Sequence, residues 1–453
     1  MALNIPPRSI GSESQSSLNS ENSHTRLIPA GRMLPFFLVT ALFFLWAIPN
    51  NLNDILIRQF MKSFEINRLQ AGLVQSAFYL GYFLLAMPAG LIMRRAGYKA
   101  GILIGLCLYG IGCILFWPAA IVDRYWFFLT ALFVIAAGLA FLETAAGSFI
   151  VQIGPAESAE RRLNLSQAFN PVGSIVALLV GSRFIFSGVQ LNKTQVAAMQ
   201  VAGTYQGYLR SETLRVIVPY VVLGTIVLLW GVLIARTPFP HMGLDYAPGA
   251  AAEDHGPSLF KRKHFVFAVV AQFLYVGAQV SVWSYMIPYV LAYTKTEERS
   301  AGYILTGTLV AFTVGRFVST WLLRYVGASR LLGIFALINA AVCAVAVLHP
   351  GWIGVGCLVA NSFFMSMMYP TIFALGVKGL GPLTKTGGAC IVMAIVGGAA
   401  ITPVMGKVSD MAGVAHGYLV PAVCFVGVAL YGLFVAQPEA GELLEAPAIE
   451  SAS

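Results

Sequence analysis

Long apolar runs separated by short polar segments make up most of this chain. Twelve of the runs are long enough to form helices that cross the hydrocarbon core of a bilayer, which takes about 20 residues. They lie at about 33–57, 70–93, 101–119, 126–152, 163–186, 216–235, 264–293, 301–323, 331–348, 352–377, 386–409 and 417–436. The pattern predicts an all-α membrane protein with twelve transmembrane helices.

A segment that contains several prolines and glycines separates the sixth run from the seventh. It divides the predicted helices into two sets of six. We predict an N-terminal six-helix bundle over residues 33–235 and a C-terminal six-helix bundle over 264–436, joined by a cytoplasmic linker over 236–263. A disordered cytoplasmic tail over 1–32 precedes them, and an acidic cytoplasmic tail over 437–453 follows them. The two tails are expected to be disordered because they are polar and show no apolar periodicity.

A short basic turn recurs in the two halves. Arg94 and Gly97 lie at the end of the second predicted helix and just after it. Arg324 and Gly327 stand in the same relation to the eighth, and each lies the same number of residues after its counterpart in the first half. Such duplication of six-helix halves is typical of secondary transporters, which bind their substrate between the repeats. Arg94 and Arg316, a cation deep in the eighth predicted helix, are candidates for a gating or structural role.

The composition excludes an ordinary soluble domain. Hydrophobic residues make up 58 % of the chain and charged residues only 10 %, whereas soluble domains carry about 25 % charged residues. The net charge of +9 comes from basic residues spread between the apolar runs, so nucleic-acid binding is not indicated. With the N-terminus inside, more lysines and arginines fall in inner segments than in outer ones. This bias predicts that both termini are cytoplasmic.

Two acidic residues, Asp54 and Glu143, lie inside predicted membrane helices. A charge at bilayer depth costs about 2.5–3.5 kcal/mol on insertion scales, so such residues usually face a protein interior or a water-filled cavity. Helical spacing places Asn50 and Asn51 on the same side as Asp54. Enclosure by protein disfavours the charged form of a carboxyl, and both acids are therefore candidates for proton coupling. The alternatives are a helix end in the headgroups for Asp54 and a permanently hydrogen-bonded structural acid for Glu143.

Amide and aromatic side chains accompany the two acids at helical spacing. Amides offer both hydrogen-bond donors and acceptors, which suits a neutral, hydroxyl-rich ligand, and aromatic rings can stack on the apolar face of a sugar. Each group alone is more typical of contacts between helices, but together they indicate a sugar cavity. The candidate substrate-binding residues are Asn51, Asp54, Gln75, Tyr79, Gln167, Asn170, Gln279 and Tyr369.

The chain shows no signature of a cofactor or metal site. Its six cysteines all fall inside apolar runs and show no C-x-x-C spacing, so we predict neither a zinc site nor a disulfide framework. Phosphate-binding and dinucleotide-binding fingerprints are also absent from the sequence. The energy for transport must then come from an ion gradient or from the gradient of the solute itself. A proton that crosses 100 mV releases about 2.3 kcal/mol.

Seven short segments carry a resemblance to a known family. In the first half they are Asn50-Asn51-Leu52-Asn53-Asp54-Ile55-Leu56, Gln75-Ser76-Ala77-Phe78-Tyr79, Leu142-Glu143-Thr144-Ala145-Ala146 and Arg162-Leu163-Asn164-Leu165. In the second half they are Tyr275-Val276-Gly277-Ala278-Gln279, Tyr369-Pro370-Thr371-Ile372-Phe373 and Thr402-Pro403-Val404-Met405-Gly406. Together they resemble the fucose–galactose–glucose–proton symporters of the major facilitator superfamily. The basic turn resembles a loop of that superfamily, with Arg94 in place of its usual aspartate.

The resemblance implies the two-bundle, twelve-helix fold of that superfamily and roles for individual residues. Asp54 corresponds to a helix-one acid that contacts sugar and takes part in proton coupling, and Glu143 corresponds to a helix-four protonation switch. The positions that correspond to the lining of the sugar cavity are Asn51, Gln167, Asn170 and, from the other half, Tyr369. The chain departs from the family at Gly147-Ser148, where Asn-Pro is common, and at Pro49 and Pro171 beside the cavity asparagines. These departures are expected to alter helix bending and sugar preference.

We therefore expect a monomeric secondary transporter in the bacterial cytoplasmic (inner) membrane, and not an enzyme. It would import L-fucose or a closely related neutral hexose by proton symport through alternating access. A glucose/galactose transporter of the same family is the alternative within this class, and competition between L-fucose and D-galactose separates the two. A non-transporting membrane sugar sensor is the alternative from another class, and it would bind sugar without flux.

Overall fold

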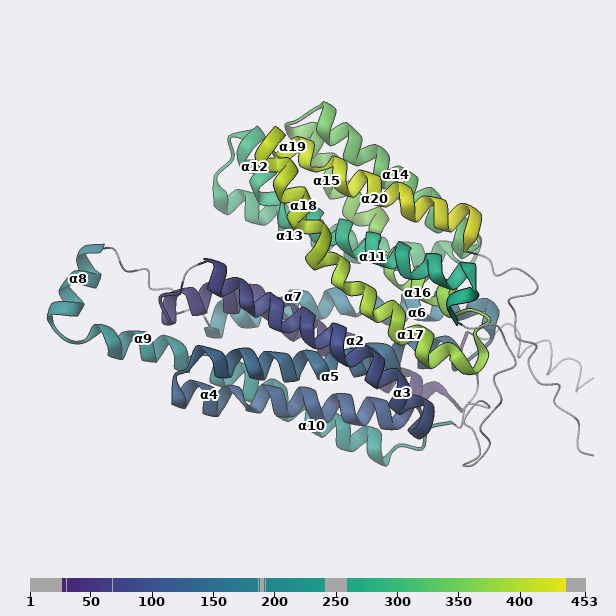
Figure 1. Cartoon of the computed structure of the whole chain (residues 1–453), viewed down its shortest axis with the longest axis horizontal. Coiled ribbons are helices and arrows are strands. Elements are labelled where there is room, and N and C mark those ends of the chain that lie inside the picture. Colours follow the sequence, from purple (N-terminus) through teal and green to yellow (C-terminus); the bar gives the residue numbers. More distant parts are fainter. Residues whose placement is uncertain are drawn as a thin grey trace, which may run out of the picture.

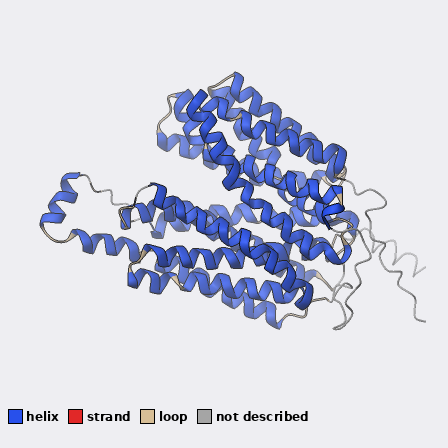
Figure 2. Ribbon diagram, in the orientation of Figure 1, coloured by secondary structure: helices blue, strands red, loops and turns tan. Residues whose placement is uncertain are grey.

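The computed structural model is built from helices throughout the residues that it describes, and these residues contain no strand (Figure 2). The described residues are 27–29, 31–66, 68–185, 187, 191, 193–240 and 259–436. Most of the predicted N-terminal tail, the centre of the predicted linker and the whole predicted C-terminal tail lie outside them.

The first half of the chain supplies nine labelled helices (Figure 1). Seven of them form a bundle: α2 (Met33–Ser63), α3 (Arg68–Ile114), α4 (Phe116–Val122), α5 (Tyr125–Gln152), α6 (Ala159–Gln167), α7 (Asn170–Val180) and α10 (Ile217–Arg236). A π-helical turn, Gly181–Ile185, extends α7. The remaining two, α8 (Lys193–Val201) and α9 (Tyr205–Leu214), form an arm that protrudes from one end of this bundle.

The second half forms another bundle that packs on the first (Figure 1). Its helices are α11 (Lys263–Ser284), α12 (Met286–Thr294), α13 (Glu298–Leu322), α14 (Ala328–Leu348), α15 (Trp352–Met365), α16 (Met368–Val377), α17 (Thr384–Met393), α18 (Gly397–Ala412), α19 (Val414–Gly417) and α20 (Leu419–Leu430). A 3-10 turn, Ala394–Val396, joins α17 to α18, and a π-helical turn, Tyr431–Val435, follows α20.

Eleven stretches of the described residues are long and apolar enough to cross a membrane. One of them, Leu73–Val122, has 50 residues, and a straight helix of that length would be about 75 Å long against a hydrocarbon core of about 30 Å. Gly97 interrupts this stretch with a positive φ of 78°, a conformation that glycine adopts without strain. Gly101 packs against Met93, so the segments on either side of Gly97 lie next to each other. The stretch therefore crosses twice, which agrees with the twelve predicted crossings.

Several of the predicted helices are interrupted near prolines. The helix predicted over 163–186 is wrong as a continuous element, because α6 ends at Gln167 and α7 begins at Asn170 with Pro171 in its first turn. Pro288 and Pro370 likewise fall in the first turns of α12 and α16. Proline lacks a backbone N–H and favours such starts. Broken helices of this kind are a common feature of transporter binding sites.

The two bundles share a hydrophobic core at one end of the molecule. We call this the linker end, because the segment between Arg236 and Lys263 attaches there, and we call the opposite end, where α8 and α9 protrude, the arm end. Phe373, Val377 and Ile391 of the second bundle belong to the same buried cluster as the first bundle's core. At the arm end the two bundles diverge, as Figure 1 shows.

Candidate functional site

The polar stripe of α2 is held in place by hydrogen bonds within α2 and to α7. Asn51 Nδ2 donates to the carbonyl of Ala47 at 2.7 Å and to Ser174 Oγ at 2.8 Å, and Asn50 Nδ2 donates to the carbonyl of Trp46 at 3.1 Å. Asn51 therefore ties α2 to α7. The backbone of Asp54 continues α2, but its side chain lies outside the part of the structure that is described.

Pro49 leaves α2 unbroken, and a neighbouring helix compensates for its missing N–H. In a regular helix the N–H of residue 49 would donate to the carbonyl of Leu45, and proline cannot do so. Tyr109 of α3 is fully buried and donates its hydroxyl to that carbonyl at 3.0 Å. The backbone group freed by proline is thus satisfied inside the bundle, as a membrane interior requires.

Glu143 lies between the two bundles and does not face lipid. The hydroxyls of Tyr82 on α3 and Tyr369 on α16 both lie within interaction reach of its carboxyl, and Tyr82 also lies within reach of Asn50. Among the described residues, Glu143 forms no ion pair with a lysine or arginine. The structure thus places this carboxyl beside one tyrosine from each bundle and leaves it without a cationic partner in the described part.

The departure at Gly147-Ser148 brings the second bundle close to α5. A Cβ atom on Gly147 would lie 3.0 Å from the Phe373 ring, and one on Gly388 would lie 2.5 Å from Ser148 Oγ. Larger side chains would hold the two bundles apart here. These small residues therefore permit the close contact between α5 and the helices α16 and α17.

Arg316 joins the two bundles through Gln167. Its side chain is 3 % exposed, and Nη1 donates to both the backbone carbonyl and Oε1 of Gln167 at 3.1 Å. The guanidinium also lies 4.8 Å from the centre of the Phe312 ring. It forms no ion pair with an acidic residue in the described chain. A buried cation without an acidic partner is costly, and here hydrogen bonds to Gln167 and the Phe312 ring face supply the compensating contacts.

The other candidate residues lie at different depths. Asn170 Nδ2 donates to the carbonyl of Phe43 at 3.2 Å. Gln75, Tyr79 and Gln279 are half-buried, and the Tyr79 hydroxyl approaches Gly398 of the opposite bundle. Arg94 is exposed and still helical, three residues before the break in α3 at Gly97.

Several contacts that the sequence pattern did not reveal close the linker end. Asn164 Nδ2 donates to Thr371 Oγ1 at 3.0 Å, and Lys378 Nζ lies 3.5 Å from Glu160 Oε1. Lys385 Nζ lies 4.7 Å from the centre of the Tyr98 ring. A cavity of about 320 Å³ lies beside these contacts, lined by residues of both bundles that include Glu160 and Lys378. The charges at the helix ends were a possible signal, but the pairing of residues so distant in sequence could not be read from spacing.

The chain is similar to characterised transporters over most of its length. Residues 35–402 match the family model of the Major Facilitator Superfamily. The chain is 45 % identical to the L-fucose-proton symporter of Escherichia coli (strain K12), over 89 % of this chain and 94 % of that protein. It is 33 % identical to a glucose/galactose transporter of Brucella abortus, over 87 % of this chain and 92 % of that protein.

A solved structure agrees with these sequence relatives. The crystal structure of the transporter FucP in the outward conformation matches with a TM-score of 0.82 and 44 % identity, over 89 % of this chain and 99 % of that one. The arrangement of two six-crossing bundles is thus the same as in that transporter. The chain belongs to the Major Facilitator Superfamily, within the group that contains these L-fucose-proton symporters and glucose/galactose transporters.

Proposed function

We propose that the protein imports L-fucose or a closely related neutral hexose together with a proton, by alternating access. The observation that carries this proposal is the position of Glu143, between tyrosines of opposite bundles and without a cationic partner in the described chain. The 45 % identity to a protein named as an L-fucose-proton symporter supports the choice of sugar. A sugar transporter of this kind is not an enzyme.

The position of Glu143 supplies a physical reason for coupling. An ionised carboxyl that is enclosed without a cation loses its hydration and gains no compensating charge. A protonated carboxyl is neutral and can be enclosed at much lower cost. Closure of the arm end over a bound sugar is therefore favoured when Glu143 carries a proton. When the linker end opens, water reaches the carboxyl and the proton can leave.

We propose that sugar binds between the bundles and contacts residues of both. Asn51, Asn170 and Gln167 offer amide groups from the first bundle, and Tyr369 offers a hydroxyl from the second. That hydroxyl is buried and lies within reach of the Glu143 carboxyl, so a sugar hydroxyl bound there would lie beside the proposed proton-coupling group. The full proposed set is Asn51, Asp54, Gln75, Tyr79, Gln167, Asn170, Gln279 and Tyr369, with Asp54 and Glu143 in proton coupling.

We further propose that the transporter is a monomer of the bacterial inner membrane with both termini in the cytoplasm. The linker end then faces the cytoplasm and the arm end faces outward. The bundles meet at the linker end and diverge at the arm end (Figure 1), which is the arrangement expected of an outward-facing state. Arg94 and Arg316 are proposed to serve gating or structure, Arg316 through its contact with Gln167.

Uptake by purified protein in liposomes tests the function. With an inward proton gradient, L-fucose should accumulate above its outside concentration, and a protonophore should abolish the accumulation. Alkalinisation of the medium on addition of sugar should report proton entry. Sugar binding without flux would favour a sensor and contradict the proposal.

A glucose/galactose transporter is the second candidate, because such a transporter is 33 % identical to this chain. Counterflow assays with L-fucose and D-galactose as competitors separate the two. Stronger inhibition by D-galactose would favour the second candidate, whereas stronger inhibition by L-fucose is the result that we expect.

A further inference from the structure

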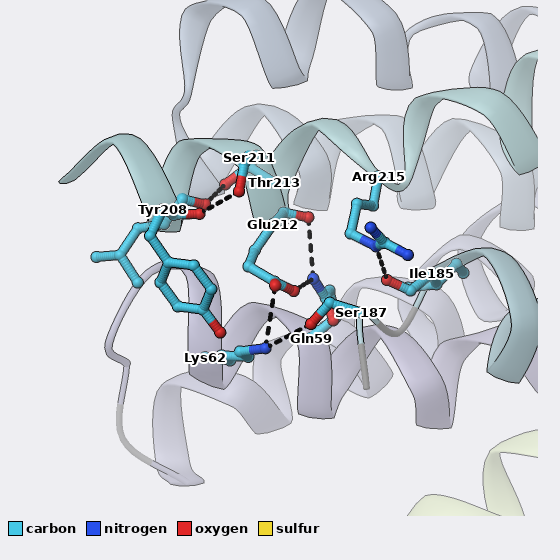
Figure 3. Close-up of polar contacts among 10 residues, drawn as sticks. Gln59, Lys62, Ile185, Ser187, Tyr208, Ser211, Glu212, Thr213 and Arg215 are labelled. Atoms are coloured by element: carbon cyan, nitrogen blue, oxygen red, sulfur yellow. Dashed lines mark hydrogen bonds and ion pairs between the residues drawn. The ribbon is translucent and has the colours of Figure 1, made fainter. Parts of the chain in front are cut away.

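A polar cluster at the arm end joins residues of α2, of α9 and of the segment after α7 (Figure 3). Lys62 Nζ of α2 lies 3.1 Å from Glu212 Oε1 of α9. Gln59 Nε2, also on α2, donates to Glu212 Oε2 at 3.0 Å and to the Glu212 carbonyl at 2.9 Å. The Glu212 side chain is 2 % exposed and Gln59 is 1 % exposed. Helix α9 is thus fastened to the outer part of α2 by a buried, charged contact.

The same region of the arm also contacts the extension of α7. Arg215 follows α9 directly, and its Nε donates to the carbonyl of Ile185 at 3.0 Å. Lys62 Nζ donates to Ser187 Oγ at 3.0 Å. Ile185 is the last residue of the π-helical turn that continues α7. The segment that includes Glu212 and Arg215 therefore contacts both α2 and the α7 extension, as Figure 3 shows.

These are the two helices that the Asn51–Ser174 hydrogen bond joins at the candidate sugar site. Gln59 lies eight residues beyond Asn51 on α2, which corresponds to about 12 Å along a helix axis. Between the two contacts, Gly181 packs against Leu52 and Ile55 of α2. The contacts at the outer ends and the Asn51–Ser174 hydrogen bond therefore join the same two helices, with packing contacts between them.

We propose that α9 clamps the outer ends of α2 and α7, and that Glu212 and Arg215 are positioning residues for the sugar site. They touch no substrate and act through the placement of Asn51 and Ser174. This inference rests on the proposed function only in the first test below, which measures transport of L-fucose. The Glu212 side chain is 2 % exposed and that of Lys62 is 31 % exposed. Neutralisation of Glu212 therefore weakens a charge-assisted contact of a buried side chain and leaves Lys62 partly hydrated, which should loosen the clamp.

Transport kinetics provide the first test. Glu212→Gln removes the charge while it keeps the shape of the side chain, and Lys62→Glu combined with Glu212→Lys exchanges the two partners. We expect Glu212→Gln to raise the KM for L-fucose about threefold to tenfold with little change in Vmax, within the range by which residues outside a ligand site modulate binding. The exchanged pair should restore most of the loss. Ser211→Ala is the matched control, because the exposed Ser211 hydroxyl of the same helix donates to the Tyr208 carbonyl within α9.

A distance measurement without sugar provides the second test. Spin labels at Arg58 of α2 and Phe184 of the α7 extension, both exposed, report the separation of the outer ends by pulsed electron resonance. Glu212→Gln should broaden this distance distribution in the purified full-length protein, and the exchanged pair should narrow it again. An unchanged distribution together with an unchanged KM would overturn the clamp. A broadened distribution in a protein that transports no L-fucose would retain the clamp and refute the proposed function instead.

Discussion

At the scale of single residues, the carboxyl of Glu143 is the group that we propose couples sugar movement to proton movement. It lies within reach of Tyr82 and Tyr369, which belong to opposite bundles, so in this proposal a change in its charge acts on both bundles. The amide nitrogens of Asn51 and Asn170 already donate to backbone carbonyls or, for Asn51, also to a hydroxyl. A sugar that binds these amides uses their remaining acceptor capacity.

Glu143→Gln should abolish proton-driven accumulation while it spares sugar exchange. Glutamine has the shape of the protonated acid but cannot release a proton, so the carrier can close over sugar without coupling to the gradient. Uptake against a gradient and counterflow exchange, measured on the same liposomes, separate the two activities. Glu157→Gln, at an exposed position, is the control. Full accumulation by Glu143→Gln would refute the coupling role of this residue.

Arg316→Lys should lower the rate of transport although it keeps the positive charge. The guanidinium makes two hydrogen bonds to Gln167 and lies over the Phe312 ring, and a lysine ammonium does not reproduce this planar geometry. Initial rates of L-fucose uptake measure the effect. Arg324→Lys, an exposed change in the basic turn of the second half, should leave the rate unchanged. Normal transport by Arg316→Lys would show that only the charge matters.

At the scale of helices, proline interrupts some membrane crossings and leaves others intact. Pro171 begins α7 after a break, whereas Pro49 lies inside a continuous α2. The difference depends on what surrounds the carbonyl that loses its donor. Beside α2, the buried Tyr109 hydroxyl takes the place of the missing N–H.

Tyr109→Phe should therefore destabilise the protein, and Pro49→Ala should reverse much of the loss. The phenylalanine variant leaves the Leu45 carbonyl buried and unsatisfied, which costs about 1–3 kcal/mol. Alanine at position 49 restores a backbone N–H that can donate to the same carbonyl. Thermal unfolding of both single variants and of the double variant in detergent measures the coupling. Strictly additive effects of the two changes would contradict the proposed exchange of donors.

The apolar runs were sufficient to predict the twelve crossings and the two-bundle fold, because each crossing needs its own length of apolar sequence. They were insufficient to predict the break between Gln167 and Asn170. Whether a proline interrupts a membrane helix depends on whether a neighbouring helix satisfies the backbone groups that the proline frees, and the local sequence does not contain that information. The contact between Arg316 and Gln167 was equally hidden. The two residues belong to different bundles, and their meeting depends on how the bundles dock, which local periodicity does not encode.

At the scale of the whole molecule, two of the contacts that hold the bundles together at the linker end differ in physical kind. One is electrostatic, the pair of Glu160 and Lys378, in which the lysine side chain is 43 % exposed. The other is steric, the close approach of Gly147 and Gly388 to the opposite bundle. A partly exposed ion pair contributes about 0–1 kcal/mol. The close packing of small residues is therefore expected to dominate this closure.

Gly388→Val tests this order of importance, because its side chain would collide with Ser148 and with the Phe373 ring. The collision should prevent closure of the linker end and shift the population toward an inward-facing state. A tenfold change in the ratio of the two states requires about 1.4 kcal/mol. Loss of the partly exposed ion pair in Glu160→Gln should therefore change this ratio much less than Gly388→Val does. A cysteine placed at Thr386, which is half-buried on α17, reports the opening through its rate of thiol labelling from the linker side. Labelling should be faster in Gly388→Val than in Glu160→Gln, and the reverse order would mean that the ion pair, rather than the glycine contact, keeps this end closed.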